Sequence, residues 1–265
     1  MLVVIIYIYF YFIKFNKIQK AKINKQIIIQ IGIQINLQMA EKNQITLGYW
    51  NIRGLGQLSR YLLEYTGLKY KEKRYQKLEE WFQKDKQGLG IEFANLPYLI
   101  DGDLKLTESH AVNLYIIRKS GKNELLGTNL IEESKIRELI GYLEDFFRQI
   151  LTLCFNPQFS IIKQQKYNDD FSLRLQRLEN QLTKDNRKWL NGQSLSLPDF
   201  IFYEISQYIK GIYPEEFKKL PKIQAFQARF EEIEQIQDYM MSEEYIYAPF
   251  LAVGHGAQWT GLKQK

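Results

Sequence analysis

The stretch Ile45-Thr-Leu-Gly-Tyr-Trp-Asn-Ile-Arg-Gly-Leu55 decides how this chain folds. Its first six residues favour a β-strand, and a turn follows at Gly54. Apolar residues then recur at helical spacing, so a helix is expected directly after the turn. Tyr49 should therefore lie at the carboxyl end of a strand and beside the amino end of a helix, which is where α/β proteins bind small anions.

The residues after this helix continue the pattern of a small α/β domain, which we expect to span 44–122. Alternating apolar residues predict strands, Gly and Asp mark a turn, and an apolar stripe marks a closing helix. The order predicts a mixed sheet covered by helices. The expected elements are a strand at 70–75, a polar helical segment around 78–82, a strand within 93–102, a hairpin turn at 101–103, a strand at 104–107 and a helix from 108–109.

The second part of the chain, 129–265, has the spacing of an all-helical domain. The start of one helix is marked by Ser196-Leu-Pro-Asp199, in which serine is the cap, proline lies in the first turn and an acid follows at the third position. The aromatic tail from Tyr245 to Trp259 is expected to fold back onto the helices. The other helices are expected from Asn129 to Asn156, over about 160–184, at 221–231 and near 233–242.

Composition excludes several classes of protein. Of 265 residues, 45% are hydrophobic and 25% charged, as in an ordinary globular protein. The lone cysteine, Cys154, excludes an intramolecular disulfide and fits a reducing compartment, so a cytoplasmic protein is expected. Two histidines, His110 and His255, lie far apart, whereas a zinc site needs a cluster of ligands; no metal site is expected.

Residues 1–38 form a leader that differs from the rest. They contain five lysines and no acid, so almost all of the net charge of +6 lies here and the remainder gives no sign of nucleic-acid binding. Leu2–Ile13 is a run of twelve apolar residues, shorter than the roughly 20 that span a bilayer. We expect residues 1–43 to be disordered or not part of the functional chain, with Met39 as a possible start. A membrane anchor is the alternative, although no stable membrane insertion is expected.

Two positions allow both a structural and a functional interpretation. The Leu96-Pro97 bond could be an ordinary strand-start proline, which composition alone favours, or a cis bond that leaves the Leu96 backbone free to pair with a peptide. Ser109 could cap its helix, the more frequent role, or present its hydroxyl and the helix end to a carboxylate.

Taken together, these segments resemble the cytosolic glutathione S-transferases, and the mu class most closely. The resemblance covers roughly 45–260, which is all of the chain except the leader. The segments that carry it are Leu47-Gly-Tyr-Trp-Asn-Ile-Arg-Gly-Leu55, Leu62-Leu-Glu-Tyr-Thr66, Asn95-Leu-Pro-Tyr-Leu-Ile-Asp-Gly102, Asn156-Pro-Gln-Phe159, Pro198-Asp-Phe200 and Arg229-Phe-Glu231.

The resemblance implies a thioredoxin-like domain followed by a helical bundle, a homodimer, and conjugation of glutathione to small hydrophobic electrophiles. Glutathione would be a co-substrate, with no prosthetic group. A free thiol has a pKa of about 8.5 and is mostly protonated at neutral pH, whereas the thiolate is the nucleophile. A hydroxyl donated by Tyr49 would stabilise the thiolate and lower the thiol pKa, and two units correspond to about 2.7 kcal/mol.

The family pattern also assigns the other glutathione contacts. Leu96, positioned by Pro97, would pair with the cysteinyl segment, and Ser109 with its helix end would bind the γ-glutamyl carboxylate. Leu55 would lie between the two substrates. The residues implied at the glycyl end and over the ligand are Trp50, Trp81, Lys86 and Asn95.

The resemblance also implies an apolar electrophile site formed by Leu55, Phe155 and the tail near Ala252. Phe93 matches an aromatic side chain that inserts into the partner subunit; its alternative is a core residue of its own chain. Cys154 is expected to be a buried packing residue.

The sequence departs from the mu class at four places. Glu108 replaces glutamine, and its carboxylate would pair with the γ-glutamyl ammonium. The loop 76–80 is short and lacks an arginine contact. Phe155 replaces a tyrosine that assists addition to epoxides and enones. The acidic residue that reaches across the dimer has no clear match, and Glu138 is one candidate.

Three functions remain open from the sequence. The first is a glutathione transferase, the second a glutathione-dependent isomerase, and the third a non-catalytic hydrophobic-ligand-binding or structural protein on the same fold. The full set Tyr49, Asn95, Pro97 and Ser109 argues against a purely structural role, because a lapsed enzyme need not keep thiol-binding residues.

Overall fold

The computed structural model of this chain describes residues 44–262; the leader and its expected roles lie outside the described residues. Residues 45–100 and 104–262 form one compact unit, which carries the fold described below. No helix among the described residues is long and apolar enough to cross a membrane.

A four-stranded mixed sheet forms the first half, in the order β2-β1-β3-β4. The strands are β1 (Ile45–Trp50), β2 (Tyr70–Tyr75), β3 (Tyr98–Asp101) and β4 (Leu104–Thr107). β1 runs parallel to β2, with Tyr49 opposite Arg74, and antiparallel to β3. β1 lies between β2 and β3, so most of its side chains are buried. Tyr49 is therefore held in place near the carboxyl end of the strand.

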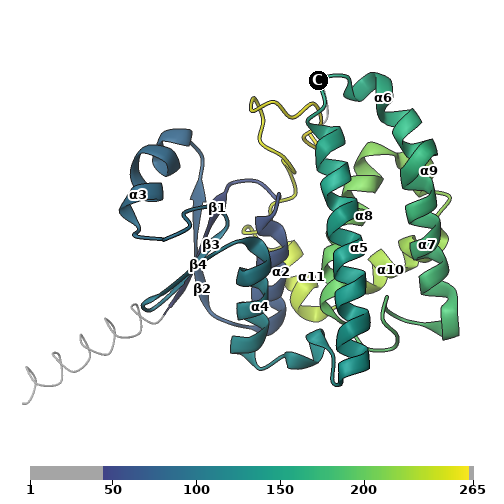
Figure 1. Ribbon diagram of the computed structural model, residues 1–265, viewed down its shortest axis with the longest axis horizontal. Coiled ribbons are helices and arrows are strands. Elements are labelled where there is room, and N and C mark those ends of the chain that lie inside the picture. The colour runs from purple at the N-terminus through teal and green to yellow at the C-terminus, as the bar shows by residue number, and fades with distance from the viewer. Residues whose placement is uncertain (1–43, 263–265) are drawn as a thin grey trace, which may run out of the picture. The chain divides into compact units, whose positions relative to one another are not determined.

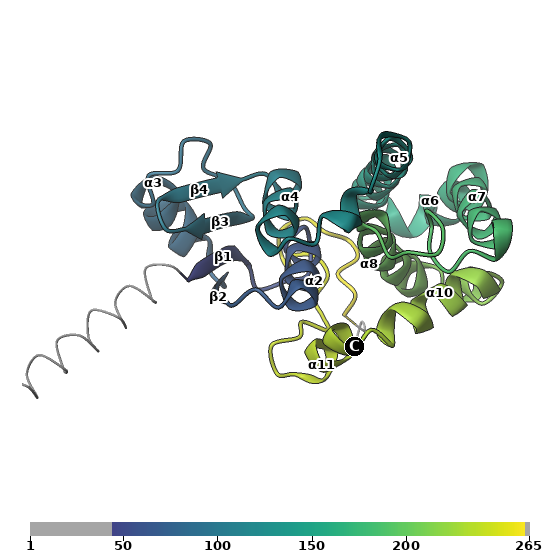
Figure 2. The ribbon, with the colours of Figure 1, turned by 90° about the horizontal axis from the view of Figure 1, so that it is seen from below.

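Helices cover the sheet and connect its strands. α2 (Gly56–Thr66) packs against α4 (Ser109–Ser120), and the two lie together beside the sheet in Figure 2. The polar segment after β2 forms a π-helix at Glu80–Asp85 that continues into α3 (Lys86–Gly88). A 3₁₀ turn at Asn123–Leu126 follows α4. The expected mixed sheet covered by helices is confirmed.

The second half is helical, as expected (Figure 1). α5 begins at Leu130 because Asn129 caps it, accepting from the N–H groups of Ile131 and Glu132. The expected helix over about 160–184 is a continuous helical run whose middle forms one π-helical turn. The elements are α5 (Leu130–Cys154), α6 (Phe159–Lys166), a π-helix at Tyr167–Phe171, α7 (Ser172–Thr183), a 3₁₀ turn at Lys184–Asn186, α8 (Leu197–Ile212), α9 (Pro214–Phe217), α10 (Pro221–Glu231) and α11 (Glu234–Met241).

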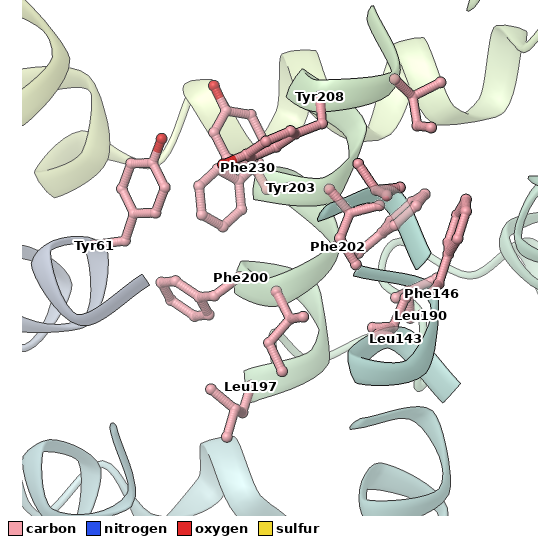
Figure 3. Close-up of a cluster of buried hydrophobic side chains, with 14 of the residues drawn as sticks. Tyr61, Leu143, Phe146, Leu190, Leu197, Phe200, Phe202, Tyr203, Tyr208 and Phe230 are labelled. Carbon is pink, nitrogen blue, oxygen red and sulfur yellow. The ribbon is translucent and has the colours of Figure 1, made fainter. Parts of the chain in front are cut away.

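α8 lies at the centre of the packing and contacts α2, α5 and α10. Its start is the expected capping box, in which the Asp199 carboxylate accepts from the Ser196 N–H at 2.8 Å. Aromatic rings of α8 meet Tyr61 of α2, whose ring centroid lies 5.6 Å from that of Tyr203 (Figure 3). The same apolar core therefore holds the sheet's helices and the helical bundle together.

Candidate active site

Tyr49 is held at the β1–α2 turn by close backbone packing. Its hydroxyl oxygen accepts a hydrogen bond from the Leu55 N–H at 2.9 Å. Two glycines flank its ring: a Cβ at Gly54 would lie 2.6 Å from the hydroxyl oxygen, and one at Gly56 would lie 2.4 Å from Cδ1. Because the oxygen already accepts from the backbone, the hydroxyl hydrogen remains available to donate to a ligand.

The electrostatics around Tyr49 favour a neutral hydroxyl. Burial raises the pKa of Tyr49, while the Leu55 N–H and the positive charge of Arg60 act in the opposite direction with smaller effect. The side chain therefore stays protonated at neutral pH. In chemical terms it is a hydrogen-bond donor whose oxygen is polarised by a backbone N–H.

Arg60 fixes the turn that carries Tyr49. Its buried guanidinium donates to the backbone oxygens of Ile52, at 2.8 Å, and Trp50, at 3.2 Å, and pairs with Glu72 at 2.7 Å. Arg60 was not among the site residues expected from the sequence. Its position directly before Tyr61 and Leu62, in an apolar helical stripe, indicates a buried arginine. A buried charge needs a partner of opposite charge or several hydrogen bonds.

Arg53 joins the same turn to the C-terminal tail. Its side chain lies 1% exposed and pairs with Glu204 of α8, with Nε 3.0 Å from Oε1. Its backbone N–H donates to Pro249 O at 3.0 Å, and the Gly54 N–H donates to Phe250 O at 2.9 Å. The expected return of the tail is confirmed, and Figure 2 shows the yellow C-terminal segment running back to the start of α2.

The residues expected to bind the γ-glutamyl end lie together at the start of α4. Asn95, which was expected near the glycyl end, lies here as well, because its amide donates to Glu108 Oε1 at 3.1 Å. Glu108 has a φ of 65°, which is rare for a residue other than glycine and is found most often at ligand sites. Its carbonyl accepts from the Val112 N–H, so Glu108 holds the cap position and the capping interpretation of Ser109 is wrong.

As the first residue of α4, Ser109 lies where helix N–H groups have no partner within the helix. It lines a small cavity of about 70 Å³ together with Gly54 and Leu55. The peptide bond between Leu96 and Pro97 is cis, the alternative that composition alone did not favour. Both residues are buried, and Leu96 packs in the same apolar cluster as Tyr49 and Tyr98.

The residues expected near the glycyl end are placed in two layers. Trp81 is 2% exposed and stacks on Tyr98 with ring centroids 6.0 Å apart, inside the aromatic core of the sheet. The outer layer contains Trp50, whose ring lies 6.1 Å from that of Phe82, and Lys86, whose Nζ lies 5.4 Å from the same ring. Trp50 and Lys86 therefore both lie against the Phe82 ring. Phe82 was not among the site residues expected from the sequence.

A cavity of about 420 Å³ opens beside Trp50. Of the residues expected at the electrophile site, Ala252 lines it, whereas Leu55 lines the smaller cavity. Phe155 is half-exposed and lies 4.0 Å from the position of a Cβ on Gly256. The other lining residues were not expected from the sequence. They come from the turn after β1, from the end of β2 with the segment that follows it, and from the returning tail: Asn51, Ile52, Tyr75, Gln76, Leu78, Phe82, Pro249, Val253 and His255.

The remaining sequence-based expectations fall on single residues. Phe93 is 73% exposed, so it is not a core residue of its own chain. Cys154 is buried, as expected, and burial raises the pKa of its thiol to about 12. Glu138 is exposed on α5. Among the described residues no group of His, Cys, Asp or Glu is arranged to hold a metal ion.

Tyr49 thus lies at the end of a strand in a mixed sheet, and a helical half follows that sheet. Comparison with known proteins identifies the family that has this architecture. The pattern "Glutathione S-transferase, N-terminal domain" matches residues 45–118, and "Glutathione S-transferase, C-terminal domain" matches 144–243. The chain belongs to the glutathione S-transferase family.

The similarity extends over whole proteins. The chain is 34% identical over 83% of its length to "Glutathione S-transferase 2" of Gallus gallus, of which 99% is covered. It is 38% identical over 77% of its length to "Glutathione S-transferase class-mu 26 kDa isozyme 51" of Fasciola hepatica, of which 91% is covered. The solved glutathione S-transferase Blo t 8 has a TM-score of 0.71 at 27% identity, with 81% of this chain and 99% of that one covered.

Proposed function

We propose that this protein conjugates glutathione to small hydrophobic electrophiles and that Tyr49 is its catalytic residue. The observation that carries the proposal is the hydroxyl of Tyr49, which accepts from the Leu55 N–H at 2.9 Å and so directs its own hydrogen outward. A donor held in this way stabilises a thiolate more than a thiol, because hydrogen bonds to a charged acceptor are stronger. The bound thiol pKa falls, and more of the nucleophilic thiolate is present at neutral pH.

Glutathione itself is bound at the start of α4 and along the Leu96 backbone. The γ-glutamyl carboxylate lies against Ser109 and the free N–H groups of the helix end, while the Glu108 carboxylate pairs with the γ-glutamyl ammonium. Asn95, which donates to Glu108 at 3.1 Å, keeps that carboxylate oriented. At the other end Trp50, Lys86 and Trp81 hold the glycyl carboxylate.

The electrophile occupies the cavity of about 420 Å³ beside Trp50, a volume within the usual range for small-molecule sites. Its apolar walls include Ile52, Leu78 and Ala252, which suit a hydrophobic substrate, and polar side chains of Asn51, Gln76 and His255 lie beside them. Phe155 has no hydroxyl to donate to a developing oxyanion. We therefore expect aromatic substitution to be favoured over addition to epoxides and enones.

The protein acts as a homodimer in the cytoplasm, with Phe93 as a contact between subunits. The Phe93 side chain is 73% exposed, and aromatic side chains are enriched in interfaces. A large ring that projects from the segment before β3 therefore has the properties of an interface anchor.

Turnover of a chloronitroaromatic with glutathione tests the function. We expect activity in the wild type, a loss of about 100-fold or more in Tyr49→Phe, as for removal of a donor that stabilises developing charge, and no loss in the exposed matched control Tyr247→Phe. Glutathione binding without turnover in the wild type would favour a ligand-binding protein. Isomerisation of a cis-enone without conjugation would favour the isomerase, and absence of glutathione binding would overturn both the transferase and the isomerase.

A further inference from the structure

A cavity of about 500 Å³ lies apart from the two cavities described above. It is formed by α8, the end of α10, Met240 of α11 and the C-terminal tail. None of the residues proposed to bind glutathione or the electrophile lines it. Its volume is within the range of small-molecule sites, so the question is which ligand its walls would accept.

The walls of this cavity are aromatic. Trp259 lies against α8 where Gly211 leaves room, since a Cβ on Gly211 would be 2.6 Å from Trp259 Cζ2. The Trp259 ring is 5.2 Å from that of Phe250. Aromatic faces carry negative potential and attract cations. The aromatic residues that line the cavity are Tyr203, Tyr245, Tyr247, Phe250 and Trp259.

Arg53 also lines the cavity, but it offers nothing to an anion. A guanidinium has five N–H donors. In Arg53 two of them donate to the Glu204 carboxylate, two to the hydroxyls of Tyr61 and Tyr245, and one to the Ile246 carbonyl. The donors are all used, the charge is paired with Glu204, and the guanidinium already lies over the Tyr245 and Phe250 rings, so Arg53 itself offers no site to an anion.

Glu231 supplies a carboxylate with an open oxygen. Its Oε1 accepts from the Tyr203 hydroxyl at 2.8 Å and from the Gln207 amide at 3.4 Å. No described residue donates to its Oε2. Lys210 at the rim is exposed and makes no ion pair with any described residue. Two charged groups are therefore left for a ligand, the Glu231 carboxylate and the Lys210 ammonium, and of these Glu231 is the one held in place by neighbouring side chains.

We propose that this cavity binds a small organic cation, an aromatic or alkyl ammonium, with Glu231 as its counter-ion and the Tyr and Trp faces around its charged group. Aromatic walls with one carboxylate are the arrangement that recognises ammonium ligands. The site is independent of the thiol chemistry at Tyr49. It gives the protein a second ligand class, opposite in charge to glutathione.

The test is calorimetric binding of benzyltrimethylammonium to the full-length chain, compared with its uncharged isostere neopentylbenzene. We expect one saturable site, with the cation bound about tenfold or more tightly than the isostere. Glu231→Gln keeps the acceptor for Tyr203 and removes the charge, so it should weaken cation binding about tenfold, whereas the exposed neighbour Glu232→Gln should leave it unchanged. Gly211→Ala, which displaces Trp259, should also weaken it.

Binding should persist when S-hexylglutathione saturates the transferase site. Equal affinity for cation and isostere would overturn the proposal, and this comparison needs no variant. Full binding by a folded Glu231→Gln protein, or displacement of the cation by S-hexylglutathione, would overturn it as well.

Discussion

At the scale of single residues, the position of Tyr49 depends on two neighbours without side chains, Gly54 and Gly56. Gly56 is the first residue of α2, and a methyl group there would meet the tyrosine ring at 2.4 Å. The ring cannot move without losing the hydrogen bond from Leu55 that orients its hydroxyl. The glycine is therefore part of the site, although it carries no functional group.

Gly56→Ala should lower kcat/KM about 100-fold while the protein remains folded, because small displacements of a catalytic group have effects of this size. The measurement is steady-state conjugation together with a thermal melt. Gly141→Ala is the matched control, since Gly141 is also helical and a Cβ there has nothing within 4 Å. Equal activity of both variants would contradict the account.

Cys154 illustrates a residue whose chemistry is suppressed by its surroundings. Burial raises its pKa to about 12, so the thiol stays protonated below that pH and supplies no thiolate in the neutral range. We expect the native protein to resist alkylation by iodoacetamide at pH 8 and to react with one equivalent after unfolding. Rapid native alkylation, followed by mass spectrometry, would contradict this.

At the scale of elements, the start of α8 shows which local signals can be read from sequence. Ser196 and Asp199 are three residues apart, and their reciprocal hydrogen bonds need no long-range information. The carboxylate also accepts from the Leu190 N–H at 2.8 Å, outside the motif. The helix and its cap were thus predictable, whereas its link to the preceding loop was not.

Asp199→Ala should lower the free energy of unfolding by about 2–4 kcal/mol, since it removes a cap and leaves buried N–H groups of Leu190 and Ser196 without acceptors. Chemical denaturation measures the change. Glu243→Ala, on an exposed side chain, should change it by less than about 0.5 kcal/mol. Similar values for the two variants would show that the cap contributes little.

The candidate site was predictable where the sequence keeps its parts close, and not elsewhere. Tyr49, Gly54 and Leu55 lie within one turn, so a hydroxyl at a strand end could be inferred. Arg53 and Glu204 are 151 residues apart, and nothing in either local pattern pairs them. The walls of the cavity proposed to bind the electrophile depend on the tail's return to that turn, which required the three-dimensional structure.

The Arg53–Glu204 pair joins the β1–α2 turn to α8 in the core, two elements that are far apart in the sequence. Glu204→Ala should destabilise the protein by about 3–5 kcal/mol, the usual effect of leaving a buried charge unpaired. Exposed Glu243→Ala is the control. A loss below about 1 kcal/mol would mean that the pair is dispensable.

At the scale of the whole molecule, the exposed Phe93 is the feature that a single chain does not explain. Its ring is 73% exposed and lies outside both buried clusters, in a part of the chain that also precedes the cis peptide bond of the proposed site. The proposed dimer would cover it. The same assembly would hold two transferase sites, each with its own Tyr49.

Phe93→Ser should shift the protein from dimer to monomer in sedimentation velocity, because the substitution removes an apolar anchor whose loss often costs 2 kcal/mol or more, about thirtyfold in the dissociation constant. Ile161→Ser, which alters a similarly exposed side chain on α6, should remain dimeric. A dimer of unchanged affinity in Phe93→Ser would place the interface elsewhere.

The central claim, that Tyr49 stabilises the glutathione thiolate, is tested most directly by the pKa of the bound thiol. Thiolate absorbance near 240 nm, titrated against pH in the saturated complex, gives this value for the wild type and for Tyr49→Phe. The account predicts a wild-type pKa about two units below the free value of about 8.5, and a return toward 8.5 in the variant with glutathione still bound. Equal pKa values in the two complexes would contradict it.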